Sequence, residues 1–324
     1  MNPLLSVQDL RVGFATDDGQ VRAVDGVSFD LGAGEIVAIV GESGCGKSVT
    51  AQTLIGLTRS PNATITGSVM FDGRDLNILP DNELQKMRGA RIAMVFQDPM
   101  TSLNPVYRVG DQIAEAIRAH RDVSKADAIA HAVELLEMVG IPNPQRRVRD
   151  YPHEFSGGMR QRVMIAMALA LEPEVLIADE PTTALDVTIQ AQILDLLRKL
   201  NREKNVSVVL ITHDLGVVAE LAHRVVVMYA GQVVEQAGLE ELFDAPQHPY
   251  TRGLLESIPR LDTVRSERLP QIPGHPPSLL RPPAGCRFAA RCPESFERCT
   301  EAPPLVDHSA HQVRCWNAVE VNVR

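Results

Sequence analysis

Residues 35–57 read EIVAIVGESGCGKSVTAQTLIGL, and this stretch decides the fold. A continuous apolar run, 35–40, leads into a glycine-rich turn, which leads into a segment with helical character, 47–57. A solid apolar strand followed by a helix is typical of a parallel sheet that is covered on both faces. We therefore predict an α/β core with this turn at the carboxyl end of a buried strand.

The turn fits the pattern G-x-x-x-x-G-K-[ST] without deviation, and it has the required strand before it and helix after it. Backbone N–H groups in such a loop point at phosphate oxygens, and the helix N-terminus adds partial positive charge. Lys47 is expected to reach the β- and γ-phosphates, and the Ser48 hydroxyl to ligate Mg²⁺. The residues predicted to contact the nucleotide are Gly41, Ser43, Gly44, Cys45, Gly46, Lys47, Ser48 and Val49.

Two acidic residues end a second apolar run, Val175-Leu176-Ile177-Ala178-Asp179-Glu180. Four residues buried in a sheet would bring both carboxylates to its carboxyl edge, where α/β proteins bind ligands. Asp179 is then suited to hold Mg²⁺, and Glu180 to act as general base toward the attacking water. The alternative is a buried strand that happens to end in acids.

Length and composition are those of an ordinary globular protein: 324 residues, 44% of them hydrophobic and 23% charged. The net charge of −9 gives no support for nucleic acid as the main partner. No secretory signal and no apolar run long enough to span a membrane are recognised. We therefore expect a cytosolic chain that reaches a membrane only through a partner.

Segments of the chain differ in apolar periodicity and in their content of proline and glycine. Alternating residues in 4–14 and 21–31 predict half-buried antiparallel strands, and 111–140 has helical periodicity. Further strands are predicted at 67–71, 91–97, 175–179, 206–212 and 224–230, and further helices at 158–171, 188–203 and 215–222. Proline and glycine become frequent after about residue 245, which predicts a boundary near Asp244. The predicted domains are 1–244, with a helical subdomain at about 98–165, and 245–324.

The segment Phe155-Ser156-Gly157-Gly158-Met159-Arg160-Gln161-Arg162 resembles the signature motif of ABC-type ATPases, in the form FSGGM instead of the commoner LSGGQ. Other family motifs follow in order: Gln97 in VFQDPMTSLNP resembles the Q-loop, Ala184-Leu185-Asp186 the D-loop, and His213 in VLITHDL the switch histidine. The resemblance covers roughly residues 4 to 240. It implies a P-loop (RecA-like) ATPase core with an N-terminal antiparallel β subdomain, an inserted α-helical subdomain and a C-terminal Cys-containing extension.

The resemblance also implies roles for these residues. The catalytic set would be Glu180, His213, Gln97 and Lys47, with Ser48, Gln97 and Asp179 around Mg²⁺. Ser156, Gly157 and Gly158 would close over the γ-phosphate of an ATP molecule held by a second subunit. The family stacks an aromatic ring on adenine near the first strands; Phe14 is the candidate, with a core phenylalanine as the alternative.

The segment after about residue 245 indicates which kind of ABC-type ATPase the chain resembles. HPYTRGLL at 248–255, RLPQIPGHPPSL at 268–279 and the segments at 285–288 and 291–293 resemble the C-terminal region of ATPases from dipeptide, oligopeptide and nickel importers. Cys286, Cys292, Cys299 and Cys315 have the spacing C-x5-C-x6-C-x15-C. Four thiolates suit a [4Fe–4S] cluster or tetrahedral zinc. The resemblance favours the cluster; zinc and unmetallated thiols are the alternatives.

The family implies a set of partners: a paralogous ATPase subunit in a heterodimer, two transmembrane permease subunits and an extracytoplasmic solute-binding protein. A homodimer is the alternative assembly. The chain would lie on the cytoplasmic face of the cell membrane, held there by the permeases, and nucleic acid is not expected as a partner. Peptides are the expected cargo, with nickel or another small solute as the alternative. Rival interpretations are an exporter, a non-transport ATPase acting on ribosomes or DNA, and a regulatory ATP binder.

Overall fold

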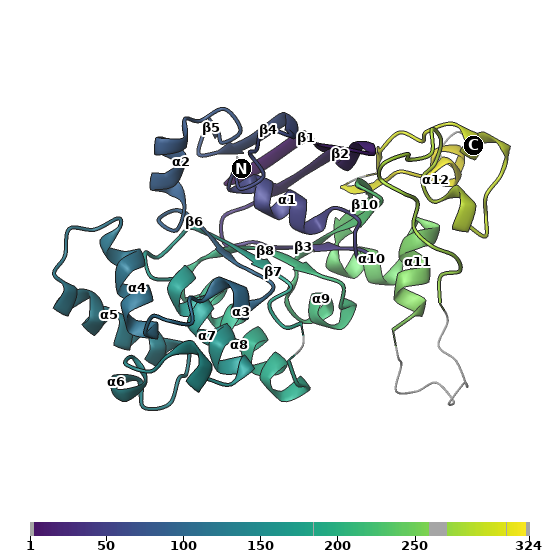
Figure 1. Ribbon diagram of the computed structural model, residues 1–324. Coiled ribbons are helices and arrows are strands. Elements are labelled where there is room, and N and C mark those ends of the chain that lie inside the picture. Colours follow the sequence, from purple (N-terminus) through teal and green to yellow (C-terminus); the bar gives the residue numbers. More distant parts are fainter. Residues whose placement is uncertain (1–2, 184, 259–270, 309, 322–324) are drawn as a thin grey trace. The chain divides into compact units, whose positions relative to one another are not determined.

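The computed structural model describes residues 3–183, 185–258, 271–308 and 310–321. The chain forms two compact units (Figure 1). The first comprises Met1–Leu31, Ile36–Ile78 and Ile211–Arg324, and the second comprises Gly32–Glu35 and Leu79–Leu210. Neither unit is a continuous stretch of chain, so segments distant in sequence pack together in each.

The first unit contains a four-stranded antiparallel sheet with the order β2-β1-β4-β5. Its strands are β1 (Leu5–Thr16), β2 (Gly19–Leu31), β4 (Ala63–Phe71) and β5 (Arg74–Asp75). Apolar residues such as Leu5, Val27 and Phe71 are fully buried on one side of this sheet, whereas polar residues alternate with them. The predicted antiparallel β subdomain is therefore confirmed.

A second group of strands in this unit has the order β11-β12-β10-β9-β3. Its members are β3 (Ile36–Val40), β9 (Arg224–Tyr229), β10 (Gln232–Gly238), β11 (Val306–His308) and β12 (His311–Val313). β3 pairs with β9 in parallel, and the other pairs are antiparallel. All five residues of β3 are buried, which is the physical reason for its unbroken apolar run.

Helices of the first unit are short. They are α1 (Lys47–Leu54), α9 (Leu215–Leu221), α10 (Leu239–Asp244), α11 (Pro249–Glu256) and α12 (Trp316–Val321), with 3-10 turns at Ala289–Arg291 and Glu297–Thr300. The predicted boundary near Asp244 falls inside this unit, since β12 hydrogen-bonds to β10. The rings of Tyr229, Tyr250 and Phe288 pack together in its core, with centroids 4.7 to 5.4 Å apart.

The second unit contains β6 (Ile92–Val95), β7 (Val175–Asp179) and the first residues of β8 (Ser207–Thr212), side by side. β6 and β7 are parallel. Its helices are α2 (Asp81–Met87), α3 (Pro99–Ser102), α4 (Val109–Arg118), α5 (Lys125–Met138), α6 (Pro144–Arg147), α7 (Gly157–Ala168) and α8 (Val187–Lys204), with a 3-10 turn at Pro152–Glu154.

The helical periodicity at 111–140 corresponds to two helices, α4 and α5, which pack on each other (Figure 1). They are separate because the Ser124 side chain accepts a hydrogen bond from the Asp127 N–H and so begins α5 afresh. In the described part of the chain, no helix combines the length and the apolar character that crossing a bilayer requires.

Candidate functional site

The glycine-rich loop between β3 and α1 turns through conformations that disfavour a side chain. Gly41 has φ +151° and Gly46 has φ +101°. A Cβ on Gly41 would lie 2.1 Å from the Met228 carbonyl oxygen, and one on Gly46 would lie 2.3 Å from the Ala23 carbonyl oxygen. Both contacts are with backbone, which cannot move aside, so glycine is required at these two positions for steric reasons.

Lys47 is buried, with 5% of its surface exposed, at the start of α1. Its Nζ donates to the carbonyl oxygens of Gly41, at 2.7 Å, and of Glu42, at 3.0 Å. The ammonium group therefore lies inside the curl of the loop. The Cys45 Sγ is 3.9 Å from the same Nζ, and burial raises the pKa of the Cys45 thiol although Lys47 opposes the rise. Cys45 is thus a buried residue of the loop.

Glu42, which the sequence left without a role, connects the loop to the C-terminal region. Its N–H donates to the Tyr250 hydroxyl at 2.9 Å. Its carboxylate accepts two hydrogen bonds from the Arg291 guanidinium, at 2.6 and 2.9 Å. Neither partner of Glu42 was predicted from the sequence. The segment HPYTRGLL at 248–255 contains Tyr250, but its sequence indicates only the resemblance to importer ATPases and not a contact with Glu42.

In the second unit, β7 ends with Asp179, which is 3% exposed, and the chain turns sharply at Glu180. Glu180 has φ +47°, the left-handed conformation that residues with a side chain seldom adopt. Its carboxylate accepts hydrogen bonds of 2.9 Å from the Gln97 Nε2 and from the Thr183 hydroxyl. The structure therefore brings two of the predicted catalytic residues, Gln97 and Glu180, into direct contact.

The segment that resembles the signature motif begins α7. The Ser156 hydroxyl accepts a hydrogen bond from the Met159 N–H and caps the helix. Ser156 and Gly157 are exposed, whereas Gly158 is buried against α8. A Cβ on Gly158 would lie 2.5 Å from the Ile189 Cγ2, so helix packing alone already requires a glycine there.

Of the residues resembling the D-loop, Ala184 lies outside the described residues. Asp186 caps α8 by accepting from the Ile189 N–H at 3.0 Å. In the first unit, His213 follows β8 and is exposed. Phe14 is half-buried in β1, where it pairs with Val21 and Ala63, so its ring is not part of the fully buried core.

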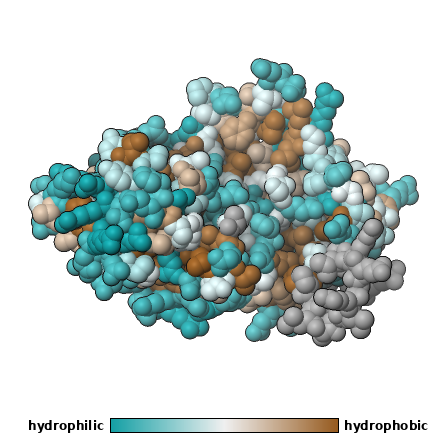
Figure 2. Space-filling view, turned by 60° about the horizontal axis from the view of Figure 1, so that its bottom comes forward, coloured by the Kyte–Doolittle hydropathy of each residue, from teal (hydrophilic) through white to brown (hydrophobic). Residues whose placement is uncertain are grey.

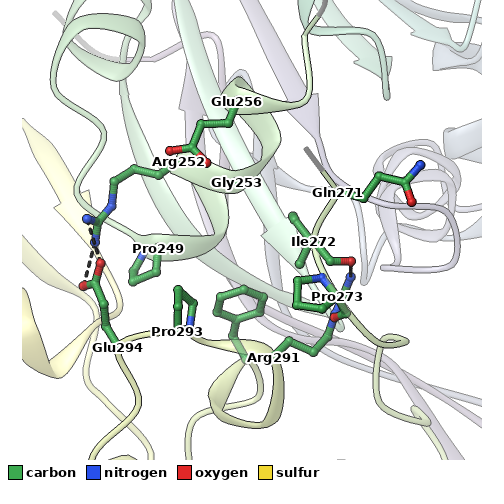
Figure 3. Close-up of a pocket in the computed structure, with 11 residues that line it drawn as sticks. Pro249, Arg252, Gly253, Glu256, Gln271, Ile272, Pro273, Arg291, Pro293 and Glu294 are labelled. Carbon is green, nitrogen blue, oxygen red and sulfur yellow. Dashed lines mark hydrogen bonds and ion pairs between the residues drawn. The ribbon is translucent and has the colours of Figure 1, made fainter. Parts of the chain in front are cut away.

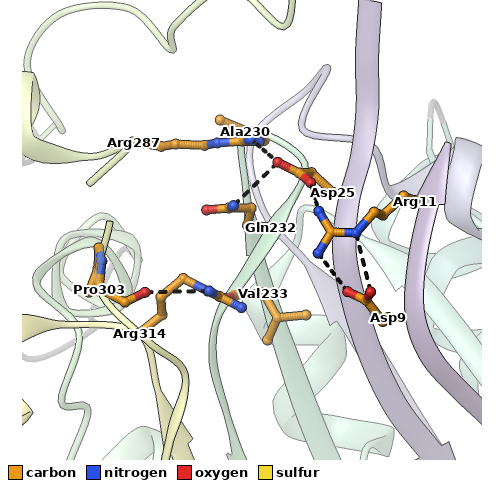
Figure 4. Close-up of polar contacts among 9 residues, drawn as sticks. All are labelled: Asp9, Arg11, Asp25, Ala230, Gln232, Val233, Arg287, Pro303 and Arg314. Atoms are coloured by element: carbon orange, nitrogen blue, oxygen red, sulfur yellow. Dashed lines mark hydrogen bonds and ion pairs between the residues drawn. The ribbon is translucent and has the colours of Figure 1, made fainter. Parts of the chain in front are cut away.

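Two arginines of the C-terminal region bind the turn between β9 and β10 and the start of β10 (Figure 4). Arg287 donates to the Ala230 carbonyl and to the Asp25 carboxylate. The Gly231 N–H of the same turn donates to the Cys45 carbonyl of the phosphate loop at 2.9 Å. The guanidinium of Arg314 donates to the Val233 carbonyl at 2.9 Å. The C-terminal region therefore supports the loop indirectly as well as through Glu42.

All four C-terminal cysteines are half-buried free thiols. Burial raises the pKa of Cys286 and Cys315, and that of Cys292 to about 11; neighbouring thiols of the set contribute to each rise. The thiols thus share one electrostatic environment, and their chemistry suits a cluster or zinc. Within the described residues, however, no group of three or more His, Cys, Asp or Glu side chains is arranged to hold a metal ion.

Comparison with known proteins agrees with the geometry. A family model described as ABC transporter matches residues 24–183, and one described as the C-terminal region of oligopeptide/dipeptide transporters matches residues 234–299. The dipeptide transport ATP-binding protein DppD of Bacillus subtilis is 55% identical over 319 residues, covering 98% of this chain and 95% of the relative. The oligopeptide transport ATP-binding protein OppD of Salmonella typhimurium is 54% identical over 320 residues, with 98% and 95% covered.

A solved structure extends the comparison to a nucleotide-bound protein. It is the dimeric post-hydrolysis state of the ATP-binding cassette MJ0796 with ADP and Pi, which is 30% identical with a TM-score of 0.66. The match covers 72% of this chain and 98% of the cassette.

Proposed function

The chain belongs to the ABC transporter family as an ATPase, and on that premise we propose that it is the ATP-hydrolysing subunit of an importer of dipeptides or oligopeptides. The observation that carries this proposal is the combination of an intact phosphate loop with a C-terminal region of the oligopeptide/dipeptide transporter type. Relatives similar over nearly the whole chain are described as dipeptide and oligopeptide transport ATP-binding proteins.

In the proposed reaction, water attacks the γ-phosphorus of ATP, the bond to the β-phosphate oxygen breaks, and ADP and phosphate leave. Glu180 accepts the proton of the attacking water. Lys47 contacts the β- and γ-phosphates. Ser48, Gln97 and Asp179 are the residues that would hold Mg²⁺, which supplies charge neutralisation for the phosphates when bound.

The remaining residues complete the proposed site. His213 contacts the γ-phosphate, and Phe14 stacks on the adenine. Ser156, Gly157 and Gly158 act on ATP held by a second subunit, for which the exposure of Ser156 and Gly157 leaves room. We propose a heterodimer with a paralogous ATPase, which places these residues over the partner's nucleotide on closure.

Transmembrane permease subunits are the proposed partners of the second unit. Apolar side chains also occur on the surface, in separate areas among hydrophilic ones (Figure 2). Four large exposed ones flank Gln97 in sequence: Phe96, Met100, Val106 and Tyr107, with exposed fractions of 36 to 72%. Clustering so close to the residue that contacts Glu180 supports a docking segment that passes on the state of the nucleotide site. The proposed location is accordingly the cytoplasmic face of the membrane, with an extracytoplasmic binding protein delivering the peptide.

For the C-terminal cysteines we propose a [4Fe–4S] cluster, supported by four half-buried free thiols in one short region of the chain. Zinc and unmetallated thiols are the competing states. Anaerobically purified protein should be brown with absorbance near 400 nm and should contain about four iron atoms per chain. Colourless protein with stoichiometric zinc contradicts the cluster.

The transport function is tested on the assembled complex. The chain should copurify with two permeases, and peptides delivered by the binding protein should stimulate ATP hydrolysis. Stimulation by nickel and not by peptides would assign the other cargo class. ATP hydrolysis that responds to no solute in a membrane-reconstituted complex would contradict import.

A further inference from the structure

Arg291 makes several hydrogen bonds near the phosphate loop. Its Nε donates to the Pro273 carbonyl at 2.8 Å, and its two terminal nitrogens donate to the Glu42 carboxylate. The same nitrogens reach the Tyr229 hydroxyl and the Ile272 carbonyl, each at 3.3 Å. Every nitrogen of the guanidinium therefore has a partner, and its position is fixed.

Arg291 is also enclosed by aromatic rings. Its guanidinium carbon lies 5.7 Å from the ring centroid of Tyr229 and 6.0 Å from that of Phe288. The Arg291 side chain is only 5% exposed, and that of Glu42 is 27% exposed. Arg291 borders a pocket of about 170 Å³, whose opposite side carries the separate Arg252–Glu294 pair (Figure 3). Solvent screens an ion pair in such surroundings only weakly, so the attraction between the Arg291 and Glu42 charges is strong.

Glu42 needs this partner because of where it stands. Its own carbonyl oxygen binds the Lys47 Nζ, and it follows Gly41 at the start of the loop. A free carboxylate at this position would repel incoming phosphates. A carboxylate bound at both oxygens by a fixed guanidinium adds little net charge.

We propose that Arg291 is a positioning residue for nucleotide binding: it neutralises Glu42 and holds it away from the phosphates. The proposal rests on the proposed function, in which the phosphate loop binds ATP. The C-terminal region then forms part of the nucleotide site through a charge that acts by way of Glu42. Nucleotide affinity, and not the chemical step, is the property that depends on it.

The test is a double-mutant cycle on the full-length chain, with Mg-AMP-PNP binding measured by calorimetry and KM and kcat for MgATP measured in parallel. Arg291→Ala should raise the dissociation constant and KM about tenfold or more and leave kcat within about twofold, with a smaller deficit at high salt. Glu42→Gln added to Arg291→Ala should restore affinity to within about threefold of wild type. A purely structural role for Arg291 predicts no rescue, and absence of rescue overturns the proposal.

Three further variants complete the test. Glu42→Gln alone should bind nucleotide at least as tightly as wild type, because Arg291 then adds an unopposed positive charge; tenfold weaker binding overturns the proposal even if Arg291→Ala does not fold. Arg252→Ala, the matched control, removes an arginine from the other ion pair at the same cavity and should leave affinity unchanged. Lys47→Ala distinguishes failure of the proposed nucleotide site from failure of the role of Arg291. Unchanged nucleotide binding in Lys47→Ala overturns the proposed nucleotide site itself. Weakened binding in Lys47→Ala together with unchanged binding in Arg291→Ala overturns only the role of Arg291.

Discussion

The Gln97 Nε2 donates a hydrogen bond of 2.9 Å to the Glu180 Oε2. Glu180 also has a left-handed backbone, and its carboxylate accepts from Thr183 as well. Two donors on one oxygen, the Gln97 Nε2 and the Thr183 hydroxyl, orient the carboxylate. The contact connects the proposed general base to Gln97, which lies in sequence among the exposed apolar residues Phe96, Met100, Val106 and Tyr107.

Replacing Glu180 with glutamine should abolish turnover without harming nucleotide binding. The amide keeps the shape of the side chain and an oxygen that accepts from Gln97, but it cannot take a proton from water. We expect kcat to fall by about 10² to 10⁴ and the dimer to persist with ATP, which size-exclusion chromatography would detect. Thr183→Ala removes one donor and keeps the carboxylate, so its loss should be less than about tenfold. If Glu180→Gln hydrolyses ATP at the wild-type rate, Glu180 is not the general base.

Gly158→Ala should destabilise the protein, whereas Gly157→Ala should not. The added Cβ would lie 2.5 Å from the Ile189 Cγ2 at position 158, but an ordinary 4.0 Å from Leu185 at position 157. We expect a loss of about 1–3 kcal/mol for Gly158→Ala in denaturant unfolding and a change within about 0.5 kcal/mol for Gly157→Ala. Adding Ile189→Ala to Gly158→Ala should recover part of the loss. Equal stability of the two single variants would contradict this packing.

His248 predicts a loss of stability in mild acid. The ring is fully buried, and its Nδ1 accepts a hydrogen bond from the Tyr250 N–H at 3.0 Å. Burial lowers the pKa of His248 from 6.5 to about 4, with Arg252 acting in the same direction and Glu235 and Glu294 opposing. Between these two pH values His248 is protonated in the unfolded chain but neutral in the folded one. Its contribution to the free energy of unfolding is therefore complete above pH 6.5 and falls as the pH drops toward 4.

The contribution of His248 over this window is about 3 kcal/mol. His248→Asn keeps an acceptor at the start of α11 and removes the titration. The difference in unfolding free energy between wild type and this variant should therefore change with pH between 6.5 and 4. Parallel stability curves for the two proteins would contradict the assignment.

Tyr250→Phe tests the other contact of Glu42. The ring packing with Tyr229 and Phe288 is kept, but the Glu42 N–H loses its acceptor. We expect a loss of about 1 kcal/mol in stability and faster hydrogen exchange at the Glu42 amide. Unchanged protection of that amide would show that the hydroxyl is not its partner.

Local pattern predicted the parts of this protein that are locally determined. The strand at Val175–Asp179 has the predicted bounds, since five consecutive buried residues leave a clear apolar run. The helix after Ser156 starts within one residue of the prediction because the serine cap marks its beginning. Strand β3 and the glycine turn after it were also predicted from local pattern, the strand from its apolar run and the turn from its glycines.

The contacts that connect the C-terminal region could not be predicted from pattern. Strands β11 and β12 have three residues each, too few to display a period. Arg291 and Glu42 are 249 residues apart, and nothing local to either residue specifies the other. Gly158 was assigned to phosphate recognition from resemblance, whereas its contact with Ile189 depends on how two helices cross.

The pairing of β12 with β10 has a consequence for biosynthesis. The buried Glu235 carboxylate on β10 accepts a hydrogen bond of 2.7 Å from His311, which is 76 residues later in the chain. While the polypeptide emerges from the ribosome, β10 is therefore an open sheet edge until β12 is synthesised. Glu235, which also accepts from the N–H groups of Gln247 and His248, lacks His311 until then. Open edges recruit other strands. A message cut short before His311 should accordingly produce an aggregating, chaperone-bound nascent protein and not a smaller working ATPase.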